Sequence, residues 1–437
     1  MEPADAPTRI PDVLRWDFGE HAAKILVRRT RHMDWILGRL FPALSLLGSL
    51  IWIYGFVQLG LRRGTISQLS ELSTDPPPDG WPSVSVIFAA RDEAGSVGRA
   101  ARTMLSQDYP TLRVIAIDDR SKDGTSEILD TIAAEDSRLI VVHVHELPEG
   151  WLGKCHALQR GAELAGPHDA WLLFTDADVM FAPGSIKRAV GYALKEGLDH
   201  LTLSPDVPTE FFVERVFMTM FCLAFMLYAP PWRLTNPGKK AALGVGAFNL
   251  VRTVAFEAVG GFRNIRLSID DDMKLGQILK FAGYRNGFLS GKGEVRVRWH
   301  VGARNMILGL EKNFFAGIDY RPAMIPISIL GIITASMLPF VGLFLGPGWV
   351  RIGSIAGIAS ACGIIALTRR QSRLAWYHAL FLPLGGFLFI FALLRSTCLT
   401  LKRGGVSWRG HLYPLALLKE HVRVRNRWMK ELWLSTR

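Results

Sequence analysis

The sequence predicts an α/β domain with a doubly wound parallel sheet, placed between apolar segments long enough to cross a membrane. Runs of β-branched and apolar residues alternate with helical patterns between residues 82 and 320. Acidic residues follow several of these runs. Near both ends of the 437-residue chain, long stretches with almost no charge approach the roughly 20 residues that span a bilayer.

The first apolar segment, residues 36–60, is broken only by Arg39 near its start and predicts a membrane anchor. It lies too far from the N-terminus, and is too long, for a cleaved signal peptide, so it is expected to remain as an anchor that follows an N-terminal segment at residues 1–35. The Pro-rich run 74–82 cannot form a helix or a central strand. Residues 61–81 are therefore predicted to link the anchor to the domain.

Four strands are expected in the domain, at residues 83–90, 112–117, 139–144 and 171–175. Acidic residues end three of them. Glu93 follows the first, Asp118 and Asp119 follow the second, and Asp176 and Asp178 follow the fourth. Because ligands of open α/β sheets bind beyond the carboxyl ends of the strands, these carboxylates are expected to converge at one edge.

The Asp176-Ala177-Asp178 triplet predicts a metal site. Two carboxylates one residue apart at the end of a buried strand can hold a hard divalent cation, Mn²⁺ or Mg²⁺, together with nucleotide phosphates. An Asp-rich turn that only caps the next helix is the alternative. The agreement with the other acidic strand ends favours the metal site.

A second acidic run, Asp270-Asp271-Asp272, precedes a helical pattern that starts at Met273. Carboxylates at a helix N-terminus cap the helix and oppose its dipole, which would explain an isolated run of this kind without chemistry.

Taken together, these motifs resemble the family 2 glycosyltransferases, inverting enzymes with a Rossmann-like GT-A fold that use nucleotide sugars. The resemblance covers about residues 82–320. It rests on five motifs in the same order, namely Ala90–Glu93, Ile117–Thr125, Gly150–Lys154, Thr175–Asp178 and Ile269–Leu275. Within the family, Gly150–Lys154 and Gly309–Asn313 are similar to the membrane-bound bacterial branch that glycosylates carotenoids, hopanoids and similar lipids.

The resemblance implies roles for these residues. Asp272 is implied as the general base, and Asp271 stands where the family has Glu, which leaves open which carboxylate of residues 270–272 is the base. The resemblance assigns the cation to Asp176 and Asp178, and the nucleotide sugar to Arg91, Glu93, Asp118, Asp119, Lys154 and Asp176.

Several assignments stay open. Lys154 is interpreted either as a phosphate contact or as an ordinary surface lysine. His300 is either a third metal ligand or a packed side chain. Lys312 and Asn313 are placed at the membrane face near the acceptor, and Asn249 lies in an acceptor-side loop without an assigned role.

The implied reaction is a single in-line displacement that moves one sugar, expected from a UDP-linked donor, to a hydroxyl or carboxyl group of a membrane lipid. A processive polysaccharide synthase is the first alternative, but it predicts a Gln-x-x-Arg-Trp motif, and residues 296–299 lack the Gln. A noncatalytic membrane scaffold with a degenerate nucleotide domain is the second.

Residues 325–401 predict two or three further membrane helices, with a buried core helix as the alternative for 352–367. Arginines flank the apolar segments at positions 62, 63, 369, 370 and 373. By the positive-inside rule they place the domain on the cytoplasmic side of a cell inner (plasma) membrane. Residues 211–228 are expected to be an interfacial element at the bilayer, or else a buried core helix.

The C-terminal tail, residues 402–437, contains nine Lys or Arg and two Glu. Four membrane crossings would leave this basic tail outside, so either one apolar stretch does not cross or the tail breaks the rule. An interfacial helix on an anionic leaflet is expected, with Trp428, Leu432 and Trp433 beside Arg425. A solvated basic tail is the alternative.

The formal charge of +12 raises the question of nucleic-acid binding, but the basic residues flank apolar segments, which is the pattern of a membrane protein. The four cysteines show no CxxC spacing and indicate neither a zinc site nor a disulfide framework.

Overall fold

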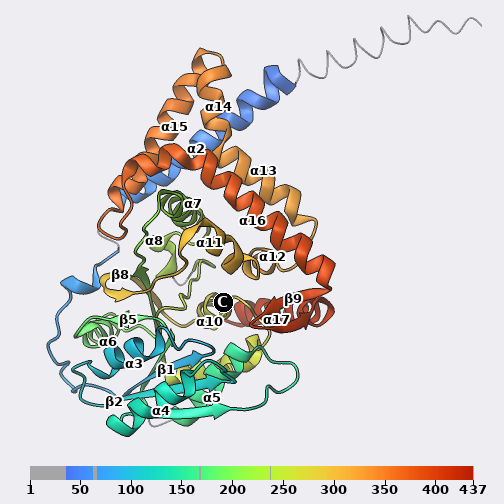
Figure 1. Ribbon diagram of the computed structural model, residues 1–437. Coiled ribbons are helices and arrows are strands. Elements are labelled where there is room, and N and C mark those ends of the chain that lie inside the picture. Colours follow the sequence, from blue (N-terminus) through green and yellow to red (C-terminus); the bar gives the residue numbers. More distant parts are fainter. Residues whose placement is uncertain (1–35, 63–65, 167–168, 237, 437) are drawn as a thin grey trace, which may run out of the picture.

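The computed structural model describes residues 36–62, 66–166, 169–236 and 238–436. The N-terminal segment 1–35 and Arg63, which entered the sequence predictions, lie outside this range. Figure 1 shows a sheet domain at one end of the molecule and apolar helices at the other.

The domain is built on an eight-stranded sheet with strand order β3-β2-β1-β4-β7-β6-β8-β5. Its strands are β1 (Val84–Ala90), β2 (Leu112–Asp119), β3 (Leu139–Val144), β4 (Trp171–Asp176), β5 (Met180–Phe181), β6 (His200–Asp206), β7 (Asn249–Arg252) and β8 (Asn286–Arg296). The predicted α/β class is confirmed, and the four strands β3, β2, β1 and β4 are parallel as expected.

The expectation of a wholly parallel sheet is wrong, because β7 runs antiparallel to both β4 and β6. The reason lies in the connection between β6 and β7. The chain leaves β6 at the carboxyl edge, forms α7 (Phe212–Tyr228) and α8 (Pro231–Leu234) there, and re-enters the sheet from the same edge. The sheet is therefore mixed.

Two apolar cores cover the two faces of this sheet. Val86 and Phe88 point to one core, which α3 (Val97–Leu105), α4 (Thr125–Glu135) and α6 (Ser185–Lys195) complete. Ile87 and Ile117 point to the other, which contains α5 (Gly153–Ala165), α9 (Thr253–Ala258), η4 (Gly261–Ile265) and α10 (Asp271–Phe281). The alternation follows from the two-residue period of a strand.

Four described helical stretches are long and apolar enough to cross a membrane, or five if one bent pair counts as a span. They contain α2 (Phe41–Leu61), α7, α15 (Gly348–Leu367) and α16 (Leu382–Arg403), and the bent pair is α13 (Met324–Ser336) with α14 (Leu338–Leu345). The 49° bend lies where Pro339 starts α14. Small residues permit close packing, since a Cβ on Gly357 would lie 2.6 Å from Ser49.

Helix α16 lies along the domain over its whole length. Near its start, the rings of Phe212 and Phe381 are 4.8 Å apart, and in its first half Phe389 lies 4.8 Å from Phe217 of α7. At its end, Arg403 pairs with Glu311 at 2.7 Å. Helix α7 therefore packs on the domain beneath α16, and its two flanking strands belong to one sheet.

The tail forms a hairpin, β9 (Gly405–Trp408) and β10 (His411–Pro414), and a helix, α17 (Leu415–Ser435). Two residues expected at the membrane instead contact the domain. Arg425 is 3 % exposed and pairs with Asp319 at 2.8 Å, and Trp433 packs on Phe281. Helix α17 thus has an apolar face against the second core.

Candidate active site

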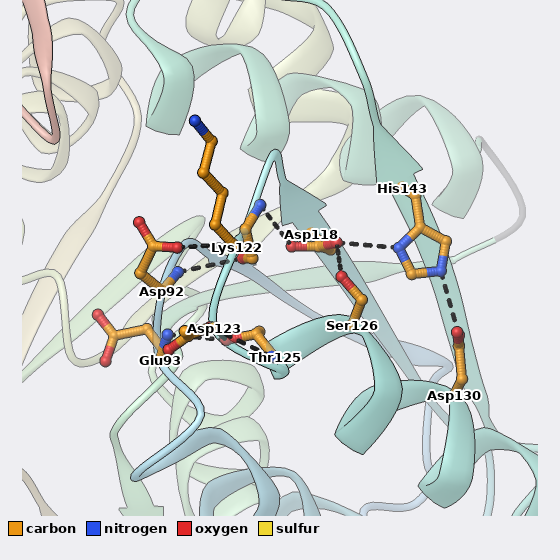
Figure 2. Close-up of polar contacts among 10 residues, drawn as sticks. Asp92, Glu93, Asp118, Lys122, Asp123, Thr125, Ser126, Asp130 and His143 are labelled. Atoms are coloured by element: carbon orange, nitrogen blue, oxygen red, sulfur yellow. Dashed lines mark hydrogen bonds and ion pairs between the residues drawn. The ribbon is translucent and has the colours of Figure 1, made fainter.

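The loops after β1 and β2 are joined by hydrogen bonds (Figure 2). The Glu93 N–H donates to Thr125 Oγ1 at 2.8 Å, and the Lys122 N–H donates to Asp92 Oδ1 at 2.8 Å. Asp92 has a φ of 55°, a left-handed conformation that turns the chain sharply. These contacts fix the backbone of both loops at the carboxyl edge of the sheet.

Asp118 and Asp119 point to opposite faces, as consecutive strand residues must. Asp118 accepts hydrogen bonds from Ser126 Oγ at 2.5 Å and from His143 Nδ1 at 2.9 Å (Figure 2). Burial opposes its charge, but these hydrogen bonds outweigh burial and hold its pKa below the ordinary value. Asp118 therefore does not join the other site residues, and its contacts are those of a loop anchor.

Asp119 does point toward the site. It pairs with Arg91 at 3.7 Å and with Arg120 at 2.8 Å. A Cβ on Gly153 would lie 2.2 Å from Asp119 Oδ2, so glycine at the start of α5 lets this helix approach the carboxylate. The Gly150–Lys154 motif and the second nucleotide-type loop therefore form one surface.

Lys154 stands at the centre of the site. Its Nζ lies 2.7 Å from Asp176 Oδ1 and 3.5 Å from Asp271 Oδ2, and its side chain is 21 % exposed. Burial disfavours the ammonium, but the carboxylates outweigh it and raise the pKa of Lys154 well above its ordinary value. The alternative of a simple surface lysine does not fit this position, because two carboxylates from different elements converge on it.

Asp178 has the surroundings expected of a cation ligand. Within the part of the chain that the structure describes, its carboxylate has no partner other than its own backbone N–H. Burial, Asp176 and Glu93 raise the pKa of Asp178 to about 7. Several crowded carboxylates with this charge imbalance fit a divalent cation. No group of three or more His, Cys, Asp or Glu among the described residues has metal-binding geometry, so Asp176 and Asp178 would share such a cation with other oxygens.

The carboxylates of Asp272 and Asp176 both lie close to Gly246. The Gly246 N–H donates to Asp272 Oδ2 at 2.6 Å, and a Cβ on Gly246 would lie 2.7 Å from Asp176 Oδ2 and 3.3 Å from Asp272 Oδ2. Burial raises the pKa of Asp272, which suits a base. Its neighbour Asp270 instead pairs with Lys274 at 3.4 Å on the same helix.

Asn249 positions this glycine loop. Its Oδ1 accepts hydrogen bonds from the Val245 N–H at 3.3 Å and from His200 Nε2 at 3.0 Å, and its side chain is buried. The loop that Asn249 holds carries the Gly246 N–H to Asp272. The sequence alone did not reveal this role.

His300 stacks on Trp299 and covers Gly309, where a Cβ would lie 2.0 Å from His300 Nε2. Of the two alternatives for His300, a metal ligand or a packed side chain, these contacts fit the packed side chain. Lys312 lies over the ring of Trp408, with Nζ 3.7 Å from its centroid. Asn313 begins α12 (Asn313–Gly317).

Residues of the C-terminal hairpin at this site were not predicted from the sequence. Arg409 forms an ion pair with Glu93, although 316 positions separate them, and the Gly153 N–H donates to Tyr413 Oη at 3.4 Å. Gly410 was the local signal for a turn, but nothing in the sequence indicated where the turn would dock.

Comparison with known proteins finds a family match within this domain. Residues 85–260 match the model of Glycosyl transferase family 2, and this range includes Arg91, Glu93, Asp119, Lys154 and Asp176.

Three curated or solved proteins illustrate the similarity. The β-monoglucosyldiacylglycerol synthase of Synechocystis sp. is 28 % identical over 248 residues, 55 % of this chain and 48 % of that protein. Succinoglycan biosynthesis protein ExoA of Rhizobium meliloti is 28 % identical over 180 residues, 40 % of this chain and 50 % of that protein. The match thus spans half or less of these relatives. The structure of mannosyltransferase PcManGT from Pyrobaculum calidifontis, in complex with GDP-Man and Mn²⁺, aligns with a TM-score of 0.47 and 16 % identity over 82 % of this chain and 99 % of that one.

Proposed function

We propose that this chain, whose residues 85–260 match the model of Glycosyl transferase family 2, moves a single sugar from a nucleotide-diphosphate sugar to a membrane lipid with inversion. The observation that carries the proposal is the placement of Asp176 and Asp272 on the two sides of Gly246. A donor diphosphate near Asp176 and an acceptor near Asp272 would be held next to each other, which is what an in-line displacement requires.

In this mechanism Asp272 takes the proton from the acceptor hydroxyl as its oxygen attacks the anomeric carbon. Gly246 holds the Asp272 carboxylate through its N–H, and Lys154 keeps Asp176 and Asp271 in place. A divalent cation, Mn²⁺ or Mg²⁺, held by Asp176 and Asp178 would neutralise the charge of the diphosphate leaving group. Arg91, Glu93 and Asp119 would contact the nucleoside.

A lipid acceptor is supported by the apolar helices beside the site. The large apolar side chains Phe387, Phe391 and Leu394 of α16 are exposed. A relative that is named for the synthesis of a glucosyldiacylglycerol agrees with an acceptor of this class. A carotenoid or hopanoid acceptor, and a uridine diphosphate donor, remain predictions from the sequence.

The membrane arrangement that we propose has three crossings, by α2, by the bent pair α13 and α14, and by α15. Arg373 pairs with Asp206 at 2.6 Å, so the loop after α15 lies on the side of the domain. Because both ends of α16 also contact the domain, α16 would lie in the bilayer surface without crossing. This arrangement keeps the basic tail with the domain in the cytoplasm, which removes the conflict with the positive-inside rule.

The membrane arrangement is tested by labelling Lys430→Cys, on the exposed face of α17, in a variant with the native Cys398 changed to Ser. A membrane-impermeant maleimide should label it only after cells are permeabilised. Labelling in intact cells would mean that α16 crosses the membrane.

The activity is tested by mass spectrometry of lipid extracts from cells with and without the gene, and by assay of the purified protein with UDP- and GDP-sugars and Mn²⁺. A lipid that gains one hexose-sized mass only in the presence of the gene is the expected result. A ladder of several hexose units would instead favour a processive synthase, the second candidate, which the relatives named for succinoglycan biosynthesis suggest. Absence of both products and of nucleotide release would overturn the enzymatic assignment.

A further inference from the structure

The hairpin of β9 and β10 is the feature that the proposed mechanism leaves unused. It follows the last apolar helix, more than 100 residues after the last acidic motif, yet it reaches the carboxyl edge of the sheet. Its two-residue turn, Arg409 and Gly410, has φ values of 48° and 76°. The left-handed conformation costs a non-glycine residue roughly 1 kcal/mol or more, so Arg409 is held at the tip against a local preference for glycine.

The hairpin contacts three separate parts of the site. Arg409 pairs with Glu93 of the first nucleotide-type loop. The ring of Trp408 lies under Lys312 Nζ at 3.7 Å, a cation–π contact. The hydroxyl of Tyr413 accepts the N–H of Gly153, the residue before Lys154.

These contacts bring the hairpin to the side of the site that holds Lys154. Tyr413 contacts Gly153, the neighbour of Lys154, and Lys154 pairs with Asp176 at 2.7 Å. Lys312, which lies over Trp408, is half-buried. Arg409 and Lys312 are thus basic side chains that belong to the hairpin or contact it, and the phosphates of a donor are anions that such side chains bind.

We propose that the hairpin is a wall of the donor site and that Arg409 binds the diphosphate of the nucleotide sugar, leaving Glu93 when the donor enters. The proposal rests on the proposed function, because it assumes a nucleoside diphosphate as ligand. A planar guanidinium donates two parallel hydrogen bonds to phosphate oxygens, and Glu93 holds the side chain in place until then. Trp408 orients Lys312 toward the same anion.

The test is nucleotide binding to the full-length protein in detergent, measured by calorimetry with UDP and, in parallel, GDP in the presence of Mn²⁺. Arg409→Ala should weaken binding of the nucleotide that wild type prefers by roughly 10- to 100-fold, as expected for the loss of a charge-assisted hydrogen bond. Arg409→Lys should retain only part of the affinity, since an ammonium lacks the two parallel N–H donors of a guanidinium. The matched control is Arg423→Ala on the exposed face of α17, which should bind as wild type.

The corresponding nucleoside, uridine or guanosine, separates phosphate binding from loop positioning. If Arg409 binds the diphosphate, Arg409→Ala should leave nucleoside affinity unchanged. Equal losses of nucleoside and nucleotide affinity in Arg409→Ala, or unchanged nucleotide affinity, would overturn the proposal while the proposed function stands. If wild type binds neither UDP nor GDP, the proposed function fails and this proposal fails with it.

Discussion

Two regions at the same sheet edge neutralise their carboxylates in different ways. In the loops after β1 and β2, Asp118 accepts hydrogen bonds from residues of the adjacent helix and strand, and its pKa is lowered. In the centre, Asp271 and Asp272 come from a distant helix, and burial raises the pKa of both. The position of a carboxylate at the end of a strand therefore does not by itself give it a catalytic role. Its partners decide whether it anchors a loop or accepts a proton.

The largest expected effect separates these roles at Asp272. Asp272→Asn keeps an oxygen for the Gly246 N–H but removes the base, so transfer should fall by roughly 10²–10⁴ while donor binding persists. Transfer and UDP affinity are measured on the same preparation. The control is Asp270→Asn, which weakens the pair with Lys274 on the same helix. If Asp272→Asn stays active and Asp270→Asn or Asp271→Asn does not, the base is that neighbour.

A change at Lys154 tests whether the centre depends on its ion pairs. Lys154→Met should leave Asp176 and Asp271 without their cation and lower the free energy of unfolding by up to about 3 kcal/mol. Thermal unfolding in detergent measures the loss. Lys154→Arg keeps a cation and should lose less. Equal stability of Lys154→Met and wild type would show that the pairs contribute nothing to the fold.

Removal of Asp178 tests the cation. Removal of a residue that hydrogen-bonds to a metal ligand typically lowers metal affinity or activity by roughly 10–100-fold. Asp178→Ala removes a proposed ligand itself, so activation by Mn²⁺ should weaken by more than that. The protein should keep its unfolding temperature, because no core side chain is lost. A manganese titration of nucleotide release measures the effect, and full activity in excess chelator would exclude a metal requirement.

The smallest effect belongs to the loop region. The hydrogen bond to Asp118 raises the pKa of His143 above 6.5, so the protonated ring stabilises the fold at low pH, and this contribution is lost as pH rises through the raised pKa. The free energy of unfolding of the wild type should fall as the pH rises above about 6.5, by about 1 kcal/mol or less since the ring is partly exposed. His143→Gln should flatten this dependence and leave transfer nearly unchanged. An identical pH profile in the variant would exclude His143 as the source.

Much of the fold was predictable because its signals are local. The β-branched runs that became β1 to β4 needed only the period of a strand and the loops that follow, and Asp176 and Asp178 were recognisable from the strand that precedes them. The apolar segments were equally clear, since their length and lack of charge are properties of the chain itself.

Three features were decided only by the tertiary structure. The antiparallel direction of β7 depends on the edge from which the chain re-enters the sheet. The side on which Asp118 and Asp119 point depends on strand register. The docking of Arg409 on Glu93 joins positions 316 apart, and no local pattern specifies such a contact. The sequence by itself determined which residues carry charge and where strands end. Long-range packing determined which charges meet, because an ion pair depends on distance in space and not on spacing in the chain.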